Sequence, residues 1–338
     1  MSSTLGKFKI ALVQLKVGAD KGANLASARK LVIEAGAKGA KLVVLPECFN
    51  SPYGTQYFSK YAEEMSESGD KKSETVQALS EMAAKAGVYL VGGSIPEREA
   101  ESGKLYNTST VYDSSGTMVA KHRKVHLFDI DVPGKIRFIE SEVLSAGDRG
   151  TVFDTPWGRI GLGICYDLRF PELAMIAARR EGIKAMIYPG AFNMTTGPLH
   201  WELLLRARAV DNMIYVAGCG PARDLEASYH AWGHSTLVGP DGQVVAGSGF
   251  EETIVYGDME TSAIDGIREA IPIYKQRRFD VYPDVADEDS KYTKLQASKQ
   301  FDDIADYTLK FGTINSKDSS ISLVNSVLTK QVKVNKVF

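Results

Sequence analysis

Cysteine and histidine are both scarce in this sequence. Three cysteines in 338 residues, a small and odd number, do not make a disulfide framework, so we expect a reducing compartment. Among the five histidines, the two pairs spaced four residues apart lack a nearby cysteine or carboxylate pattern that would complete a zinc site. The sequence therefore predicts no metal and no other cofactor.

The sequence also has no large excess of charge of one sign and no long apolar run. The 40 basic and 42 acidic residues give a formal net charge of -2, which argues against nucleic acid or an anionic membrane as the main partner. No run of about 18 apolar residues occurs, so no membrane span is expected. Residues 1–7 lack the apolar core of a secretion signal, and residues 1–15 have no arginine to suggest mitochondrial import. We expect a cytoplasmic protein, with a mitochondrial location left open.

Near-continuous apolar strands alternate with helical patterns along most of the chain. Residues 8–15 and 41–47 are typical of buried strands, and residues 24–38 of an amphipathic helix. Such strands between helices indicate a parallel sheet covered on both faces, and therefore an α/β fold. The other expected elements are helices at 73–86, 171–180 and 200–211, strands at 88–91, 160–164, 184–188, 213–217 and 253–258, and hairpins around 113–116 and 239–242.

The compact pattern fades toward the end of the chain. We assign residues 1–285 to one domain and residues 286–338 to an extension rich in serine, lysine and aspartate. The extension contains two short apolar alternations, at 321–323 and 332–334, and is expected to be disordered or to contact a partner. Inside the domain, residues 128–150 show little helix or strand pattern. So long a loop within a compact domain is usually functional.

The stretch around Cys165 lies between a predicted strand and a predicted helix. Ile160, Leu162 and Ile164 alternate as in a short strand, and Pro171 suits the first turn of a helix. Cys165 would then lie at the carboxyl end of a strand, where open α/β sheets bind their ligands. A buried structural cysteine is the alternative, because free cysteine is among the most buried residue types.

Two further residues have the chemistry to act with Cys165 on an amide. Amide cleavage needs a nucleophile, a base that takes its proton, and positive charge for the developing oxyanion. Cys165, Glu47 at the end of a predicted strand, and Lys124 in a basic segment supply these types. Taken alone, Glu47 could cap a structure and Lys124 could belong to a solvated face, and no spacing rule joins the three.

Three short motifs resemble those of the nitrilase superfamily of carbon–nitrogen hydrolases. They are LPE at residues 45–47, HRKVHL at 122–127 and GICYDLRF at 163–170, and the similarity extends over residues 7–283. The resemblance implies catalytic roles for Glu47, Lys124 and Cys165, and a second glutamate, Glu140, that orients Lys124 or the substrate. It also implies a four-layer αββα sandwich that forms homodimers through the cysteine-bearing face. For Glu140, an ordinary loop carboxylate is the alternative.

Within the superfamily, the sequence is most similar to the omega-amidase branch. The resemblance implies hydrolysis of the terminal amide of α-ketoglutaramate and α-ketosuccinamate, through a cysteine thioester, to the dicarboxylic keto acid and ammonia. The similarity rests on residues 49–54, 126–135, 188–198 and 231–235.

The acid end of such a substrate needs a cation. Arg169, four residues after the predicted nucleophile, is the first candidate, because an arginine fork matches a carboxylate. A structural ion pair with Glu172 or Asp167 is the alternative. We expect a backbone N–H near Tyr166 to bind the oxyanion. Three further side chains are expected either to shape the pocket or simply to pack: Tyr53, Phe192 and Thr195.

Three other functions remain open from the sequence. Another hydrolase of the same superfamily, such as a nitrilase, a carbamoylase or a deaminated glutathione amidase, would share the chemistry and differ in its pocket. A cysteine–histidine hydrolase would activate Cys165 through His200 or His234. A binding scaffold would use the sandwich for partners, although the intact set of catalytic residue types argues against it. Cys48 and Cys219 have no base assigned, so we interpret both as structural.

Overall fold

The computed structural model describes residues 6–65, 73–134, 136–279 and 281–282. The chain divides into two units, Met1–Gln276 and Arg277–Phe338, and the helices and strands of the described residues belong to the first. The expected boundary at residue 285 and the two apolar alternations of the extension lie outside the described residues. Within the described ranges, no helix is both long and apolar enough to cross a membrane.

The first sheet has seven strands and a parallel centre. β1, β2 and β3 run parallel, and β15, β5, β4 and β6 complete the sheet by antiparallel pairing. Six of these strands match the predicted positions, including the hairpin between β5 and β6, whereas β4 was not predicted. Their bounds are β1 (Lys7–Gln14), β2 (Leu42–Val44), β3 (Tyr89–Val91), β4 (Ile95–Arg98), β5 (Leu105–Tyr112), β6 (Met118–Arg123) and β15 (Thr253–Glu260).

The second sheet repeats this arrangement with six strands. β10, β11 and β12 run parallel at its centre, while β9 pairs antiparallel at one side and β13 and β14 at the other. Their bounds are β9 (Thr151–Thr155), β10 (Gly158–Leu162), β11 (Ala185–Pro189), β12 (Tyr215–Cys219), β13 (Thr236–Val238) and β14 (Val244–Gly247).

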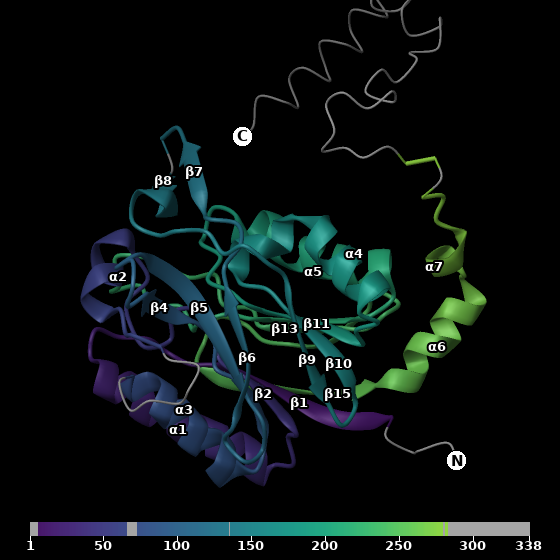
Figure 1. Ribbon diagram of the computed structural model, residues 1–338, viewed down its shortest axis with the longest axis horizontal. Coiled ribbons are helices and arrows are strands. Elements are labelled where there is room, and N and C mark those ends of the chain that lie inside the picture. Colours follow the sequence, from purple (N-terminus) through teal and green to yellow (C-terminus); the bar gives the residue numbers. More distant parts are fainter. Residues whose placement is uncertain (1–5, 66–72, 135, 280, 283–338) are drawn as a thin grey trace, which may run out of the picture. The chain divides into compact units, whose positions relative to one another are not determined.

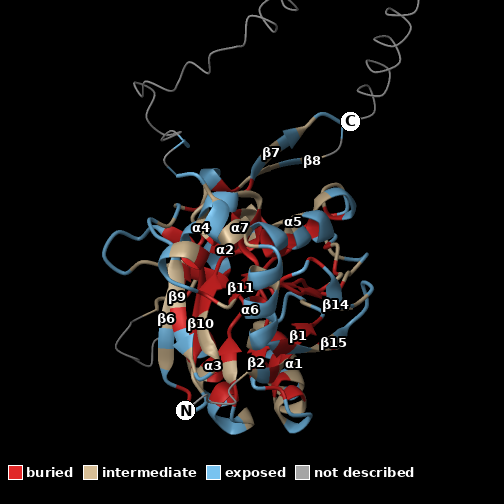
Figure 2. Ribbon diagram, turned by 90° about the vertical axis from the view of Figure 1, so that its right-hand side faces the viewer, coloured by how far each residue is buried: buried red, intermediate tan, exposed pale blue. Residues whose placement is uncertain are grey.

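The two sheets pack face to face, and helices cover their outer faces (Figure 1). α1 (Lys21–Ala37) and α3 (Glu74–Ala86) cover the first sheet, with a shared core that includes Val32 and Leu79. α4 (Pro171–Arg180) and α5 (Gly197–Asn212) cover the second sheet. A separate core between the sheets joins Leu12 and Val44 to Ile187, and Figure 2 shows these central strands buried. The predicted four-layer αββα sandwich is confirmed.

Short local signals fix where the helices begin and end. The Ser73 side chain accepts a hydrogen bond from the Val76 N–H at the start of α3, and the left-handed Gly87, at φ 63°, ends that helix. Pro171 is the first residue of α4, as predicted. α5 begins at Gly197, three residues before the predicted start at His200. The remaining helices are α2 (Thr55–Tyr61), α6 (Thr261–Ala270) and α7 (Ile273–Gln276).

The segment from 128 to 150 is not the patternless loop that the sequence suggested. β7 (Asp129–Val132) and β8 (Ile136–Ile139) form an antiparallel hairpin, followed by a 3-10 turn, η1 (Glu140–Glu142). The strands have only four residues each and expose their polar side chains, so they lack the continuous apolar runs that mark the core strands. The hairpin matters for function because it leads directly into Glu140.

Candidate active site

Each predicted catalytic residue lies just beyond the end of a strand. Glu47 follows β2 and Lys124 follows β6, both in the first sheet, whereas Cys165 follows β10 in the second. Cys165 opens a 3-10 turn, η2 (Cys165–Arg169), with φ 47°, a left-handed conformation that is strained for a residue with a side chain. The structure therefore builds the site from both sheets and holds the cysteine on a tight strand-to-helix turn.

The turn that carries Glu47 depends on a close backbone approach. A Cβ atom at Gly93 would lie 2.1 Å from the Pro46 carbonyl oxygen, and Gly93 itself has φ 59°. Only glycine fits there, and it lets the chain after β3 pack against the chain that leads to Glu47. The Ser94 N–H donates a hydrogen bond to the same Pro46 oxygen and fixes the turn.

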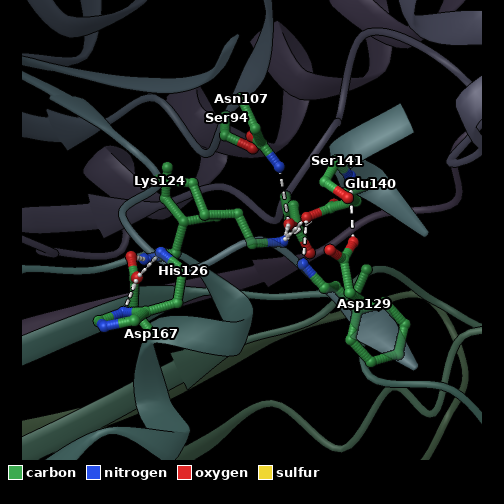
Figure 3. Close-up of polar contacts among 12 residues, drawn as sticks. Ser94, Asn107, Lys124, His126, Asp129, Glu140, Ser141 and Asp167 are labelled. Carbon is green, nitrogen blue, oxygen red and sulfur yellow. Dashed lines mark hydrogen bonds and ion pairs between the residues drawn. The ribbon is translucent and has the colours of Figure 1, made fainter. Parts of the chain in front are cut away.

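Lys124 lies between two carboxylates in a fully buried cluster (Figure 3). Its Nζ is 2.9 Å from Glu47 Oε1 and 2.9 Å from Glu140 Oε2. Asn107, from the middle of β5, donates its Nδ2–H to the same Glu47 Oε1 at 2.8 Å. Negative charge from Glu140 and Glu47 raises the pKa of Lys124 well above its ordinary value, although burial alone would lower it. The two carboxylates therefore favour the ammonium form of Lys124.

Glu140 is held in place by two other donors. Tyr53 donates its hydroxyl to Glu140 Oε1 at 2.7 Å, and the Phe128 N–H donates to Oε2 at 2.7 Å. Burial, and then the charge of Glu140, raise the pKa of Tyr53 well above its usual range, so its hydroxyl stays a donor. The Glu140 carboxylate thus contacts Lys124 directly, which is the contact that an orienting role requires.

The thiol of Cys165 interacts with Glu47. Burial and the Glu47 carboxylate raise the pKa of the Cys165 thiol, while Lys124 and a hydrogen bond from the Ala191 N–H oppose that rise. Burial likewise raises the pKa of Glu47, and hydrogen bonding with Cys165 is among the effects that lower it. Glu47 Oε2 is buried and accepts no hydrogen bond of normal geometry from the described residues. A neutral thiol thus faces a carboxylate whose second oxygen is free to accept its proton.

Asp167 ties the nucleophile turn to the segment that carries Lys124. It accepts hydrogen bonds from His122 Nε2 at 3.2 Å and His126 Nδ1 at 2.8 Å, and from the backbone N–H groups of His126 and Ile164 at 2.9 Å. Burial would raise the pKa of Asp167, but the two histidines hold it well below its usual range. Figure 3 shows His126 and Asp167 near the backbone of Lys124. These residues have a positioning role that sequence reasoning missed.

Aromatic rings enclose the carboxylate side of the site. Tyr53 stacks on Phe138 from β8, with ring centres 5.3 Å apart, and lies 4.6 Å from Tyr229. Phe128 packs edge-on against Tyr166 at 5.2 Å. Tyr229, which the sequence did not single out, donates its hydroxyl to the Ala191 carbonyl. The rings exclude water from the carboxylates and so strengthen their interactions with Lys124.

Arg169 makes no ion pair with Glu172 or Asp167, so the expected structural alternative is wrong. Asp167 is engaged by the histidines, and among the described residues Arg169 pairs with no carboxylate. Its guanidinium lies 4.9 Å from the Phe192 ring, and one nitrogen lies 3.0 Å from His200 Nδ1. Arg169 Nε is buried without a hydrogen-bond partner in the described structure, and burial lowers the pKa of the group. The side chain has spare capacity for an anion.

A cavity of about 300 Å³ opens beside the Glu47 carboxylate. Glu47 and Tyr53 line it, whereas four of the expected substrate contacts do not. Thr195 lies in a turn where its N–H donates to the Asn193 side chain. The residues that do not line this cavity are Tyr166, Arg169, Phe192 and Thr195.

Comparison with known proteins identifies the family. A model of the carbon-nitrogen hydrolase family matches residues 9–269. The chain belongs to the carbon-nitrogen hydrolase family. It is 59% identical over 278 residues to a hydrolase of Schizosaccharomyces pombe, and the alignment covers 82% of this chain and 84% of that protein. It is also 57% identical over 278 residues to an omega-amidase of Xenopus laevis, and that alignment covers 82% of this chain and 98% of that protein.

A solved structure supports the same assignment for this carbon-nitrogen hydrolase. Nit3 of Saccharomyces cerevisiae, a member of branch 10 of the nitrilase superfamily, is 50% identical, with a TM-score of 0.75. The match covers 82% of this chain and 100% of that one. The superfamily inferred from the three sequence motifs is therefore confirmed.

The remaining thiols of this carbon-nitrogen hydrolase are buried and free. Cys219 lies in the core between the sheets, where its Sγ contacts the carbonyl oxygens of Val13 and Val44. Cys48 follows Glu47 and lines the cavity; burial raises its pKa well above the ordinary value, and its side chain is hydrogen bonded with Ser94. Among the described residues, no group of histidine, cysteine and acidic side chains has the arrangement of a metal site.

Proposed function

We propose that this carbon-nitrogen hydrolase is an omega-amidase that cleaves the terminal amide of α-ketoglutaramate and α-ketosuccinamate. The observation that carries the proposal is a buried cysteine, lysine and glutamate site in a chain that is 57% identical to a protein named omega-amidase. Several further relatives at 56–57% identity bear the same name, which favours this branch over the carbamoylase and deaminated glutathione alternatives.

Acylation follows from the contacts around Cys165. Glu47 takes the thiol proton, and the sulfur attacks the amide carbon. Lys124 and a backbone N–H near Tyr166 stabilise the tetrahedral oxyanion. Glu47 then gives the proton to the leaving nitrogen, the carbon–nitrogen bond breaks, and ammonia departs from a thioester on Cys165. Glu140 holds the Lys124 ammonium against this charge, because it binds the same Nζ.

Glu47 is also the base in deacylation. Glu47 takes a proton from water, the oxygen attacks the thioester carbon, and the carbon–sulfur bond breaks as the acid leaves. The thiolate is protonated again by Glu47. The second half-reaction needs no new group, since Glu47 Oε2 has no other hydrogen-bond partner in the described structure.

Two further parts of the proposal concern assembly and location. α4 and α5, which follow the nucleophile, expose large apolar side chains that a second copy of the chain would cover, and these support a homodimer. They are Ile176, Leu199, Leu203 and Val210. The three free cysteines support a reducing compartment such as the cytoplasm.

The proposal is tested by substrate choice. We expect ammonia release from α-ketoglutaramate with a kcat/KM at least about tenfold above that for a nitrile, a carbamoyl amino acid or deaminated glutathione. A coupled ammonia assay on the full chain measures all four. Equal or faster turnover of any of the other three compounds would overturn the omega-amidase assignment.

Arg169→Met should separate binding of the acid end from chemistry. If the guanidinium pairs with the substrate carboxylate, KM for α-ketoglutaramate rises about 10- to 100-fold, because a charge-assisted contact of about 1.5–3 kcal/mol is lost. A neutral short amide that lacks the carboxylate should lose little. Circular dichroism checks that the variant is folded. An unchanged KM for α-ketoglutaramate in the folded variant would mean that the substrate carboxylate does not bind Arg169.

A further inference from the structure

Asn107 contacts both members of the pair formed by Glu47 and Lys124. Its side-chain Nδ2 donates a hydrogen bond to Glu47 Oε1 at 2.8 Å, and its backbone carbonyl accepts one from the Lys124 N–H at 2.8 Å. In Figure 3 the side chains of Asn107 and Lys124 converge. Asn107 is 1% exposed and lies in β5, whose residues are all buried. Its amide therefore reaches Glu47 from a position that the sheet fixes.

The two oxygens of Glu47 have different partners. Oε1 accepts a hydrogen bond from Asn107 Nδ2 and another from Lys124 Nζ, the second at 2.9 Å. Oε2 accepts no hydrogen bond of normal geometry from the described residues. A carboxylate oxygen has two lone pairs, and the two donors occupy those of Oε1. The proton that leaves the Cys165 thiol is therefore received by Oε2.

The direction of the hydrogen bond from Asn107 follows from charge. An ionised carboxylate only accepts hydrogen bonds, so an asparagine in contact with it presents its NH2 group. A hydrogen bond to the ionised form of an acid favours that form, and such charge-assisted bonds are stronger than neutral ones. Burial raises the pKa of Glu47 and Lys124 lowers it. The Asn107 N–H acts in the same direction as Lys124, because it also binds the ionised form.

A substitution of Asn107 changes none of the charges around Glu47. The titratable groups that act on Glu47 come from several elements: Cys48 beside it, Tyr53, Lys124 after β6, Glu140 in η1, Cys165 in η2, and Tyr229 between β12 and β13. The hydrogen bond from the Lys124 N–H to residue 107 joins two backbones, so it does not involve the side chain that is replaced. A change in pH dependence would therefore report the lost N–H donor.

We propose that Asn107 is a positioning residue that occupies Glu47 Oε1, so that Oε2 serves as the base, and that stabilises the ionised carboxylate. The inference rests on the proposed function, because it assumes that Glu47 takes the Cys165 proton. In acylation that proton moves from sulfur to Oε2 as the carbon–sulfur bond forms. The same proton then goes to the leaving nitrogen as the carbon–nitrogen bond breaks, while Oε1 keeps both donors.

Asn107→Leu tests the proposal, because leucine is close to asparagine in size and has no side-chain N–H. Without the donor the carboxylate takes up a proton at a higher pH, so activity is lost earlier as the pH falls. We expect the acid limb of kcat/KM to move up by about one to two pH units, the shift that matches one charge-assisted hydrogen bond. Asn107→Ala, which only removes atoms, should show the same shift. Initial rates of ammonia release from α-ketoglutaramate by the full chain give the profiles.

Asn50→Leu is the matched control. Asn50 is also fully buried, its Nδ2 donates to Glu63 Oε1 at 3.3 Å, and Lys21 pairs with the same oxygen at 3.0 Å. This set repeats the arrangement around Glu47 away from the proposed nucleophile. The control should lower the melting temperature and leave the acid limb where it is. The position of a limb does not depend on the amount of folded enzyme, so partial loss of folded protein leaves the comparison valid.

A double variant shows whether Asn107 acts through Glu47. At the pH where the wild type is half active, a shift of one pH unit lowers kcat/KM about fivefold. In a Glu47→Gln background, Asn107→Leu should change the residual kcat/KM by less than about twofold, because the carboxylate on which it acts is gone. An equal loss in both backgrounds would overturn the inference, since Asn107 would then act independently of Glu47.

The outcomes separate this inference from the proposed function. If Glu47→Gln removes the acid limb but the limb of both Asn107 variants stays at the wild-type pH, the inference is overturned and the proposed base stands. An equal shift in Asn50→Leu also overturns the inference. If the acid limb persists in Glu47→Gln, the proposed base is itself wrong. Failure on α-ketoglutaramate with turnover of another amide overturns the omega-amidase assignment alone, because the same profiles can be measured with that amide.

Discussion

Replacing Cys165 by alanine is expected to lower kcat/KM for α-ketoglutaramate by about four to six orders of magnitude, the range found when a catalytic nucleophile is deleted. The loss follows from chemistry, because no other thiol can replace this one. Cys219 lies between the sheets, and Cys48, although it lines the cavity beside Glu47, is hydrogen bonded with Ser94, whereas Cys165 is hydrogen bonded with Glu47. Initial rates of ammonia release over a range of substrate concentrations measure the loss, and acid-quenched mass spectrometry of the wild type detects the acyl adduct.

Cys219→Ala is the matched control for that experiment. It removes an equally buried thiol and should cost about 1 kcal/mol of stability through the small cavity left behind, with kcat nearly unchanged. If Cys165→Ala kept more than about one per cent of wild-type turnover, as a scaffold or a different nucleophile would allow, the thioester route would be wrong. An acyl adduct on Cys48 would instead overturn the assignment of Cys165 as the nucleophile.

Much of the fold could be predicted because the central strands are buried on both faces. Runs such as 10–13 and 42–45 consist of apolar residues that are all buried. Continuous apolar strands of this kind are typical of parallel sheets, so hydrophobicity alone indicates the parallel centres of both sheets. The ends of those strands then mark where Glu47 and Cys165 lie. What hydrophobicity does not give is the pairing of two similar sheets, since the core between them joins residues more than a hundred positions apart.

The rest of the site lies in residues whose roles depend on contacts distant in sequence. Asn107 lies within a fully buried strand. Asparagine is depleted in strands, so its presence there is a sequence signal that could have identified this position. The sequence indicates Asp167 only as a partner for Arg169, because a single sequence does not show that His122 and His126 fold back onto it. Tyr229 lies in a loop without periodicity, and only its contact with Tyr53 reveals its place.

Glu47→Gln is the second change with a very large expected effect. Glutamine keeps the volume and one oxygen for the Lys124 and Asn107 contacts, but it cannot take the thiol proton or protonate the leaving nitrogen. We expect kcat/KM to fall about 10³-fold, within the usual range for loss of a general acid–base. Burial raises the pKa of Glu47 above 4.5, so the active carboxylate is lost as the pH falls through that raised pKa. The wild-type acid limb should therefore lie above pH 4.5, and the variant's residual activity should lack it.

The same substitution decides between glutamate and histidine as the base. The hydrogen-bond partner of the Cys165 side chain is Glu47, whereas His200 Nδ1 lies 3.0 Å from an Arg169 nitrogen and the His234 ring stacks on Trp232 with ring centres 4.1 Å apart. Activity of Glu47→Gln within about tenfold of wild type, beyond what loss of one acid–base group permits, would nevertheless favour a histidine. Glu63→Gln is the control: that carboxylate is also buried and paired, with Lys21 and Ser73, but it contacts no catalytic residue. It should lower the melting temperature and leave kcat within about twofold, so a loss shared by both variants would point to folding rather than to the base.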